Sequence, residues 1–242
     1  MKPNISHKIP TDILEICQTF KKNGFQIYLV GGSVRDLLLN RSVEDYDLAT
    51  DAYPEQSDSL FAKAETRGEE FGTIAIPRKN QPGHWAEITT FRLESEYTAA
   101  RYPRKIIFVS DLKEDLARRD FTVNALAYDP INHILIDEYE GLRDLKAKIL
   151  RCVGDPEQKF TEDTLRILRA LRFVGQLDFE LEENCARVIQ KIAASFKLPS
   201  KIRIKQELTK IKQTKNSKKS LMLLQKTGIL QRIQAKIGST HV

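Results

Sequence analysis

The chain has 242 residues, of which 41% are hydrophobic and 30% are charged, and its formal net charge is +6. A chain of this length and composition can bury a real core and is typical of a globular protein with one large or two small domains. No apolar run reaches membrane-spanning length, residues 1–22 lack a signal-peptide core, and the three scattered cysteines give no disulfide framework. We therefore expect a cytosolic protein with no membrane partner and no zinc site.

The charge is divided unevenly along the chain. Residues 151–242 hold 19 Lys and Arg against 9 Asp and Glu, whereas residues 1–150 hold 20 against 24. This asymmetry fits an acidic catalytic part followed by a basic part that binds a polyanion. A basic helical surface that simply faces water would explain the asymmetry equally well.

The first chemical signal follows a predicted helix over residues 11–22. Residues 26–30 are a short apolar run typical of a strand, and the glycines Gly31 and Gly32 allow a tight turn close to a ligand. A helix is predicted from residue 33, and the free N–H groups at its start would face that ligand. An anion such as a triphosphate fits there, with Arg35 as a further donor.

Two aspartates, Asp45 and Asp47, close the next predicted strand. Residues i and i+2 of a strand point to the same face, which places the two carboxylates together, with their Cα atoms roughly 6.5 Å apart. Carboxylates this close repel each other unless a cation lies between them, and oxygen-only ligands favour Mg²⁺. A phosphate-binding turn beside such a pair predicts two-metal phosphoryl transfer.

Each motif alone has an ordinary explanation, because a glycine pair is usually a loop and two spaced aspartates are usually a solvated strand end. Both motifs in this order within residues 28–50 are hard to obtain from packing needs alone. The stretch resembles the GG-x-V-R-D…D-x-D head motif of the class II tRNA nucleotidyltransferase and bacterial poly(A) polymerase family, among the DNA polymerase β-like nucleotidyltransferases. The resemblance implies an α+β fold, with a small mixed β-sheet in the head and an all-α neck after it.

Two further strands, residues 71–77 and 84–92, are predicted around the polar turn 78–83. The second carries Glu87, one strand away from the aspartates. The resemblance implies a third carboxylate on such a strand, which accepts the proton of the attacking hydroxyl, and Glu87 is the candidate. An exposed strand glutamate would look the same.

Residues 93–105 show no clean period and are expected to form a loop. By resemblance this is a mobile loop that helps the pocket to change its nucleotide choice. The family pattern carries an aspartate and paired arginines here, whereas this chain has Ala99 and Tyr102 at two of those positions. This departure weakens the switching role and leaves the metal site untouched.

Residues 118–125 follow a short predicted strand, 105–109, and a helix, 111–118, and they match the family's R-R-D-F-T-x-N-A. Arg119 can pair with phosphate oxygens, and Asp120 can accept from a ribose hydroxyl, which would favour ribonucleotides. Asn124 can bridge the sugar and the backbone. A helix end with surface charges explains one such residue but explains the whole octet poorly.

A last hairpin is predicted over residues 125–137, followed by a helix over 141–148 and a linker over 151–159. The linker places a domain boundary after residue 150. Residues 1–150 are the predicted catalytic head, and residues 151–242 are the predicted neck, which recognises the base and faces the RNA.

Thr161 is predicted to cap a helix in which Asp163, Arg166, Arg169 and Arg172 recur every third residue. Such a stripe is usually a salt-bridged exposed face. A carboxylate beside a guanidinium also presents an acceptor next to a donor, which matches the edges of both cytosine and adenine and clashes with guanine and uracil. By resemblance to the family's E-D-x-x-R motif, Asp163 and Arg166 read the base, while Arg169 and Arg172 support it or touch phosphates.

Further helices are predicted over residues 180–196, 201–212 and 217–228, in a region with twelve Lys and Arg after residue 196 against the single acid Glu207. Family members continue into body and tail domains that hold tRNA, and we expect a short member with head and neck only. Either basic side chains would then hold the acceptor stem, or a second copy or a partner subunit would supply the missing contacts. The candidate RNA-binding residues are Lys201, Arg203, Lys205, Lys210 and Lys212.

The sequence therefore predicts a template-independent nucleotidyltransferase that adds C, A or both from CTP and ATP to the 3′ end of tRNA, with Mg²⁺ on Asp45 and Asp47. Addition of poly(A) to other RNAs stays open within the same class. A non-catalytic RNA-binding relative is the alternative from another class, and it would have no need of the paired aspartates.

Overall fold

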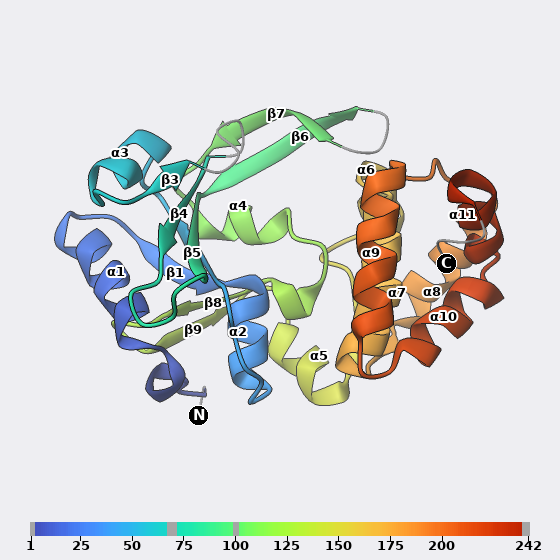
Figure 1. Cartoon of the computed structure of the whole chain (residues 1–242), viewed down its shortest axis with the longest axis horizontal. Helices are drawn as coiled ribbons and strands as arrows, with labels where there is room; N and C mark the ends of the chain where they lie inside the picture. Colours follow the sequence, from blue (N-terminus) through green and yellow to red (C-terminus); the bar gives the residue numbers. More distant parts are fainter. Residues whose placement is uncertain (1–2, 67–71, 99–101, 239–242) are drawn as a thin grey trace. The chain divides into compact units, whose positions relative to one another are not determined.

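The computed structural model describes residues 3–66, 72–98 and 102–238, without the side chains of residues 95–98 and 102–105 (Figure 1). The chain forms two compact units. One consists of Met1–Glu94, Ile106–Arg119 and Val123–Leu142, and the other of Ser95–Lys105, Asp120–Thr122 and Arg143–Val242. The division into domains at residue 150 stays a prediction.

A seven-stranded sheet organises the first unit, in the order β3-β4-β5-β2-β1-β8-β9. The β2–β5 pair is parallel and the other pairs are antiparallel, so the predicted α+β fold with a mixed sheet is confirmed. The strands are β1 (Ile27–Val30), β2 (Tyr46–Thr50), β3 (Glu65–Thr66), β4 (Thr73–Pro77), β5 (Trp85–Thr90), β8 (Leu126–Asp129) and β9 (Ile134–Asp137).

The core of this unit lies on both faces of β1. Val30 packs in a buried cluster with Leu112 and Leu116 of α4 (Leu112–Ala117), and Tyr28 packs against the same cluster. Ile27 and Leu29 alternate with these residues and are also buried, so they point to the opposite face. The helices α1 (Thr11–Lys22) and α2 (Gly31–Leu38) contact β1 as well.

The first helix has the predicted bounds, Thr11–Lys22, because its apolar residues follow the helical period. Its buried apolar side chains are Ile13, Ile16, Cys17 and Phe20. Further short helices described in or at the boundary of the first unit include the 3-10 turns η1 (Ser6–Lys8) and η3 (Thr122–Asn124) and the helix α3 (Pro54–Ser59).

The loop expected over residues 93–105 is a strand hairpin instead. It consists of β6 (Arg92–Thr98) and β7 (Tyr102–Phe108), which pair with each other in a separate two-stranded sheet. A ribbon that joins no larger sheet needs no continuous apolar face, so its sequence lacks the alternation that marks a half-buried strand. Of the two departures from the family pattern, Ala99 lies outside the described residues and Tyr102 begins β7.

Helices dominate the second unit. The elements from the end of the first unit onward are α5 (Gly141–Ala147), the short parallel strands β10 (Ile149–Leu150) and β11 (Glu180–Leu181), and the helices α6 (Pro156–Glu162), α7 (Leu165–Leu177), α8 (Glu183–Ile192), α9 (Lys201–Gln213), α10 (Ser217–Lys226) and α11 (Ile229–Ile237). Along the described stretches of the chain, no helix combines the length and the apolar character needed to cross a membrane.

The predicted N-cap at Thr161 is wrong. Asp155 caps α6 earlier, with its carboxylate accepting from the N–H of Gln158 at 2.9 Å, and Pro156 follows at the favoured first position. Thr161 lies inside this helix and donates to the carbonyl of Glu157. A break at Asp163, which is extended at φ −136°, then separates α6 from α7.

Candidate active site

The turn at the start of α2 brings a glycine against an arginine. The helix begins two residues earlier than predicted, at Gly31, whose φ of +66° carries no steric cost only for glycine. A Cβ atom at Gly31 would lie 2.9 Å from Nη1 of Arg119 and 3.7 Å from Oδ2 of Asp47. The missing side chain therefore lets a cationic and an anionic group approach the start of the helix together.

Three carboxylates lie on or beside the parallel strands β2 and β5. Asp47 is in register with Glu87, which confirms that Glu87 lies on the strand next to the aspartates. Asp45 precedes β2 by one residue, and its Oδ1 accepts a 2.9 Å hydrogen bond from the N–H of Trp85. The N–H of Asp47 donates to Oγ of Ser33 at 2.9 Å, which ties β2 to the first turn of α2.

Asp45 and Asp47 line one open pocket of about 280 Å³. Asp47 keeps solvent-exposed area at this pocket. Dense packing around its carboxylate nevertheless raises the pKa of Asp47 to about 6 against the opposing charge of Arg119, and Glu87 and Asp45 also raise it. The pocket residues are Gly32, Ser33, Asp36, Ser42, Val43, Glu44, Asp45 and Asp47.

Like charges thus crowd around Asp47, and a cation would relieve their repulsion. Within the described part of the chain, no group of three or more His, Cys, Asp or Glu side chains is placed to hold a metal ion. Four acids line the pocket, and of these Asp45 and Asp47 lie at the start of β2, whereas Asp36 is already paired with Arg35.

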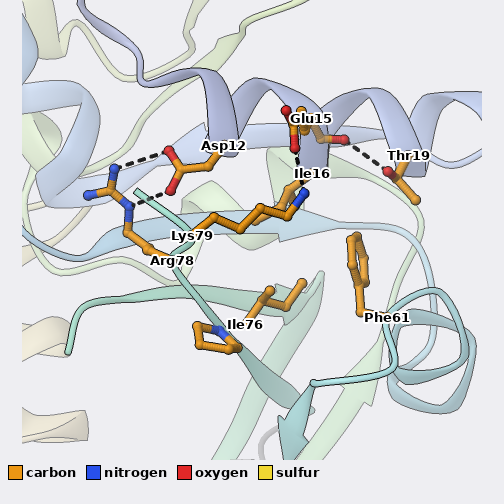
Figure 2. Close-up of a pocket in the computed structure, with 9 residues that line it drawn as sticks. Asp12, Glu15, Ile16, Thr19, Phe61, Ile76, Arg78 and Lys79 are labelled. Carbon is orange, nitrogen blue, oxygen red and sulfur yellow. Dashed lines mark hydrogen bonds and ion pairs between the residues drawn. The ribbon is translucent and has the colours of Figure 1, made fainter. Parts of the chain in front are cut away.

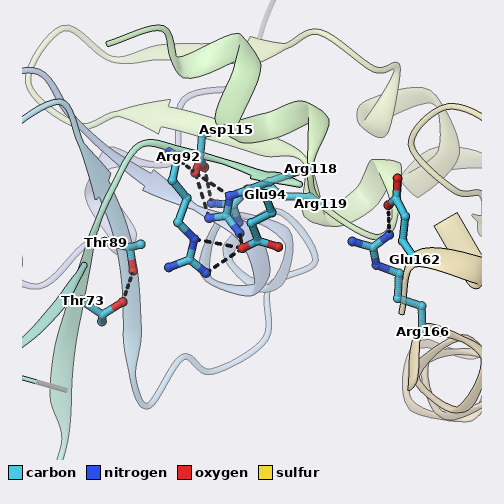
Figure 3. Close-up of polar contacts among 9 residues, drawn as sticks. All are labelled: Thr73, Thr89, Arg92, Glu94, Asp115, Arg118, Arg119, Glu162 and Arg166. Atoms are coloured by element: carbon cyan, nitrogen blue, oxygen red, sulfur yellow. Dashed lines mark hydrogen bonds and ion pairs between the residues drawn. The ribbon is translucent and has the colours of Figure 1, made fainter. Parts of the chain in front are cut away.

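Arg119 forms an ion pair with Asp115 of α4. Nη2 of Arg119 donates to Oδ2 of Asp115 at 3.0 Å, and Nε of Arg118 donates to Oδ1 at 2.9 Å (Figure 3). Burial acts to raise the pKa of Asp115, but the two guanidiniums bring it below its ordinary value. Nε of Arg119 is buried without a hydrogen-bond partner, which leaves a donor suited to a phosphate oxygen.

Arg35 is buried next to the glycine turn. Its Nη1 donates to Oδ1 of Asn124 at 2.6 Å, while Nε and Nη2 donate to the carboxylate of Asp36 at 3.0 and 2.6 Å. A Cβ atom on Gly32 would lie 3.4 Å from Nη2 of Arg35. The structure thus brings two predicted nucleotide ligands, Arg35 and Asn124, together as supports of the turn.

In the second unit, Asp120 is paired with Arg169 of α7. Nε of Arg169 donates to Oδ2 of Asp120 at 2.7 Å, and Nη2 lies 2.6 Å from the same oxygen. Oδ1 of Asp120 accepts from the N–H of Phe121 at 2.9 Å. The guanidinium of Arg169 also lies over the ring of Phe173, at 5.5 Å from its centroid.

Asp163 and Arg166 each have further partners within the same unit. Oδ1 of Asp163 accepts from the N–H of Leu165 at 2.9 Å, and its Oδ2 lies 3.6 Å from Nη2 of Arg203. Nη1 of Arg166 donates to Oε2 of Glu162 at 2.7 Å (Figure 3). Burial raises the pKa of Asp163, against the charge of Arg203.

The arginines of α7 do not form the exposed stripe that a charge pattern usually means. Arg166 and Arg172 are buried. Nε of Arg172 donates to Oε2 of Glu207 on α9 at 2.7 Å, and its guanidinium lies 4.2 Å from the centroid of the Phe173 ring. Arg172 therefore joins two helices of the second unit.

The predicted RNA-binding side chains of α9 do not share one face. At about 3.6 residues per turn, Lys201, Lys205 and Lys212 line one side of the helix, and Arg203 and Lys210 lie on the other. The four lysines are exposed, whereas Arg203 is partly buried beside Asp163.

Two family comparisons cover most of the chain. Residues 27–151 match the family described as "Poly A polymerase head domain". The chain belongs to the poly A polymerase head-domain family. Residues 178–237 of this family member also match "Probable RNA and SrmB- binding site of polymerase A". Membership of the tRNA nucleotidyltransferase and poly(A) polymerase family, predicted from the glycine and aspartate motifs, is confirmed.

Curated relatives of this head-domain protein carry a more specific name. The CCA-adding enzyme of Lactobacillus helveticus is 43% identical over 229 residues, which are 95% of this chain and 56% of that enzyme. The CCA-adding enzyme of Bacillus licheniformis is 48% identical over 176 residues, which are 73% of this chain and 43% of that enzyme. The chain thus spans about half the length of these relatives.

Solved structures share the fold of this family member. The Bacillus stearothermophilus CCA-adding enzyme in complex with CTP has a TM-score of 0.80 and 36% identity, covering 95% of this chain and 53% of that one. A tRNA nucleotidyltransferase complexed with a primer tRNA and an incoming ATP analog has a TM-score of 0.74 and 31% identity, covering 90% and 62%.

Sequence reasoning missed Asp115, which joins Arg119 to α4. The signal was present, because an acid three and four residues before two arginines on a helix is the spacing of a helical ion pair. It missed Glu94 as well, which accepts from Arg92 and Arg118 at 2.9 Å each (Figure 3). No local spacing connects Glu94 with Arg118.

Proposed function

We propose that this chain transfers C, A or both from CTP and ATP to the 3′ end of tRNA without a nucleic acid template. The observation that carries the proposal is Asp47, in register with Glu87 and close to Arg119 at the Gly31 turn. Carboxylates for a cation and an arginine for a phosphate are what nucleotidyl transfer requires. The relatives named CCA-adding enzyme, and the solved structures with CTP or with primer tRNA and an ATP analog, support these substrates.

Asp45 and Asp47 would hold a divalent cation, and we assign Mg²⁺ because the donor atoms are carboxylate oxygens. The donor set fits a cation, since burial, with the like charges of Glu87 and Asp45 added to it, raises the pKa of Asp47 to about 6. A bound cation would polarise the phosphate oxygens and stabilise the charge that develops on them.

The remaining roles in the first unit belong to side chains beside β2, β5 and the Gly31 turn. The RNA 3′-hydroxyl attacks the α-phosphate, and pyrophosphate leaves. Glu87 accepts the hydroxyl proton in this scheme, and Arg119 binds phosphate oxygens through donors that include its unpartnered Nε. Gly31 and Gly32 admit the phosphates to the backbone, while the Arg35–Asn124 pair fixes the turn and meets the sugar.

The second unit supplies the groups that select the nucleotide. Asp120, oriented by Arg169, accepts from the ribose hydroxyl. Asp163 and Arg166 present an acceptor and donors to the base edge, which suits cytosine and adenine. Arg172 supports this arrangement by joining α7 to α9.

The tRNA acceptor stem is the proposed partner of the basic residues on α9, and a second copy or a partner subunit would add contacts if these are insufficient. The exposed face with Lys201, Lys205 and Lys212 is the better-placed part of the set. The cytosol is the proposed compartment, in keeping with three buried free cysteines.

The test uses labelled tRNAs that lack one, two or three of the 3′-terminal CCA nucleotides, each incubated with a single nucleotide and resolved on a gel. We expect CTP to extend the ends that need C, ATP to extend the end that needs A, and UTP and GTP to be rejected. Long A tracts on any RNA would instead assign poly(A) polymerisation. RNA binding without extension by any nucleotide would assign the non-catalytic alternative.

A further inference from the structure

A buried ion pair lies on the first unit outside the residues assigned so far. Arg78 follows the last residue of β4, and Asp12 lies in the first turn of α1. Nε and Nη2 of Arg78 each lie 3.2 Å from a carboxylate oxygen of Asp12, and the two side chains are only 2% and 3% exposed (Figure 2). Removing two charges from water costs free energy, and the further contacts of the two side chains help to offset that cost.

The same guanidinium contacts both neighbours of Asp45. Nη1 of Arg78 donates to the backbone carbonyl of Glu44 at 3.2 Å. The guanidinium carbon lies 5.0 Å from the centroid of the Tyr46 ring, which is itself buried. One arginine therefore holds the residue before Asp45 and the residue after it.

The other end of the β4–β5 turn holds Asp45 directly. The N–H of Trp85 donates to Oδ1 of Asp45 at 2.9 Å, and the N–H of Arg78 donates to the carbonyl of His84 at 3.0 Å, which closes the turn. Asp45 precedes β2 and has no place in the strand ladder. Its position therefore depends on this turn.

We propose that Arg78 is a positioning residue for the cation ligand Asp45, fixed in place by its ion pair with Asp12. The inference rests on the proposed function, because it assumes that Asp45 and Asp47 bind a divalent cation. Groups that orient metal ligands without touching the metal change metal affinity or activity by about 10- to 100-fold when they are removed. Arg78 fits that description, since its charge is neutralised by Asp12 and its Nη1, which also donates to Oε1 of Gln81, donates to the backbone beside Asp45.

The chain offers a matched control in the next residue. Lys79 forms an ion pair with Glu15 of α1 at 2.7 Å, and its side chain is 76% exposed (Figure 2). It joins the same strand end to the same helix, but an exposed pair of this kind contributes little to stability. Lys79→Met thus removes a cation from the same place without touching the contacts to Glu44 or Tyr46.

The experiment measures Mn²⁺ binding to the full chain by electron paramagnetic resonance, well below the melting temperature of every variant. We expect Arg78→Lys and Arg78→Met to weaken Mn²⁺ binding about 10-fold or more. Lys79→Met should bind within about twofold of wild type, because it changes only an exposed pair. Arg78→Lys keeps a positive charge near Asp12 and so guards against a simple folding failure.

Mg²⁺ titration of nucleotide incorporation supplies a second readout. A positioning defect should be restored by excess Mg²⁺ in Arg78→Lys, with the nucleotide KM little changed, whereas Asp47→Ala should stay inactive. If Arg78→Lys binds Mn²⁺ as tightly as wild type, the positioning role of Arg78 is wrong, even if the variant melts at a lower temperature. That result would leave the proposed function untouched. A Mn²⁺ affinity unchanged by Asp47→Ala would contradict the cation site of the proposed function, and this inference with it.

Discussion

The carboxylates at β2 and β5 and the arginines of α7 are both charge clusters, but they differ in how their charge is balanced. Around Asp47, burial raises the pKa of the carboxyl to about 6 against the charges of Arg119 and Arg35, and the like charges of Glu87 and Asp45 add to the rise. On α7, each arginine has an acid beside it: Glu162 for Arg166, Asp120 for Arg169 and Glu207 for Arg172.

This difference separates two kinds of functional residue. The crowded carboxylates are unfavourable in the protein alone, which is how a site for a cation is built. The paired arginines are already stabilised, so they hold their acids in fixed positions and can present a rigid surface to a ligand. Removing a carboxylate from the cluster around Asp47 should therefore abolish nucleotide incorporation. Changes in the α7 cluster should instead alter the choice of nucleotide.

The largest effect is expected from the aspartates. Asp45→Ala or Asp47→Ala should lower incorporation by about a thousandfold or more, because the charge stabilisation lost with a cation is worth several kcal/mol. Single-turnover incorporation measures the loss, and circular dichroism should show an intact fold. Either variant within tenfold of wild type would show that the cation is bound elsewhere.

The second-largest effect is expected from Arg119→Met. This substitution should lower kcat/KM by about 100-fold, because it removes charge-assisted hydrogen bonds to phosphate. Arg187→Met is a suitable control, because its side chain is 69% exposed and lies on α8. Steady-state kinetics with CTP and ATP test the prediction. Equal effects of the two substitutions would remove Arg119 from the nucleotide site.

Asp163→Ala should have a smaller effect on rate and a clear effect on base choice. Each buried group left unpaired by the wrong base costs about 1–3 kcal/mol, so discrimination against UTP and GTP should fall by roughly 10- to 100-fold. Competition between ATP and GTP measures this ratio, with the exposed acid variant Asp178→Ala as control. If Asp163→Ala discriminates as wild type does, the base is read elsewhere.

The smallest effect is expected on α9. Replacing Lys201, Lys205 and Lys212 together should weaken RNA binding. It should also flatten the slope of a plot of log K for RNA binding against log[salt], by up to about one unit per lost phosphate contact. Nucleotide affinity should not change. Lys210→Ala, on the opposite side of the helix, should bind RNA as wild type does, and an equal loss there would argue against a single RNA-facing side.

Much of this site was predictable because its residues lie close together in sequence. The glycine turn, the aspartates and residues 118–125 are local motifs, and the strand of Glu87 followed from alternation. The register that sets Glu87 beside Asp47 depends on a parallel pairing that no local pattern contains. The contacts of Arg78 with Asp12 and Glu44 likewise join residues 66 and 34 positions apart.

The errors have physical causes of the same kind. Thr161 is a good capping residue, but Asp155, six residues upstream, caps the helix instead and places Thr161 inside it. Residues 93–105 lack alternation because their hairpin joins no larger sheet. In both cases the structural context, and not the local preference of the residues, decided the outcome.

The most direct test of the cation site is the number of protons released when Mg²⁺ binds, measured by isothermal titration calorimetry in buffers of different ionisation enthalpy. Only the ionised carboxylate binds the cation, so a pKa of about 6 for Asp47 implies that binding weakens as the pH falls below 6. Proton release attributable to Asp47, taken as wild type minus Asp47→Asn, should be near zero at pH 8 and should rise towards one per Mg²⁺ at pH 5. Tight Mg²⁺ binding with the same proton release in wild type and Asp47→Asn at every pH would contradict the account.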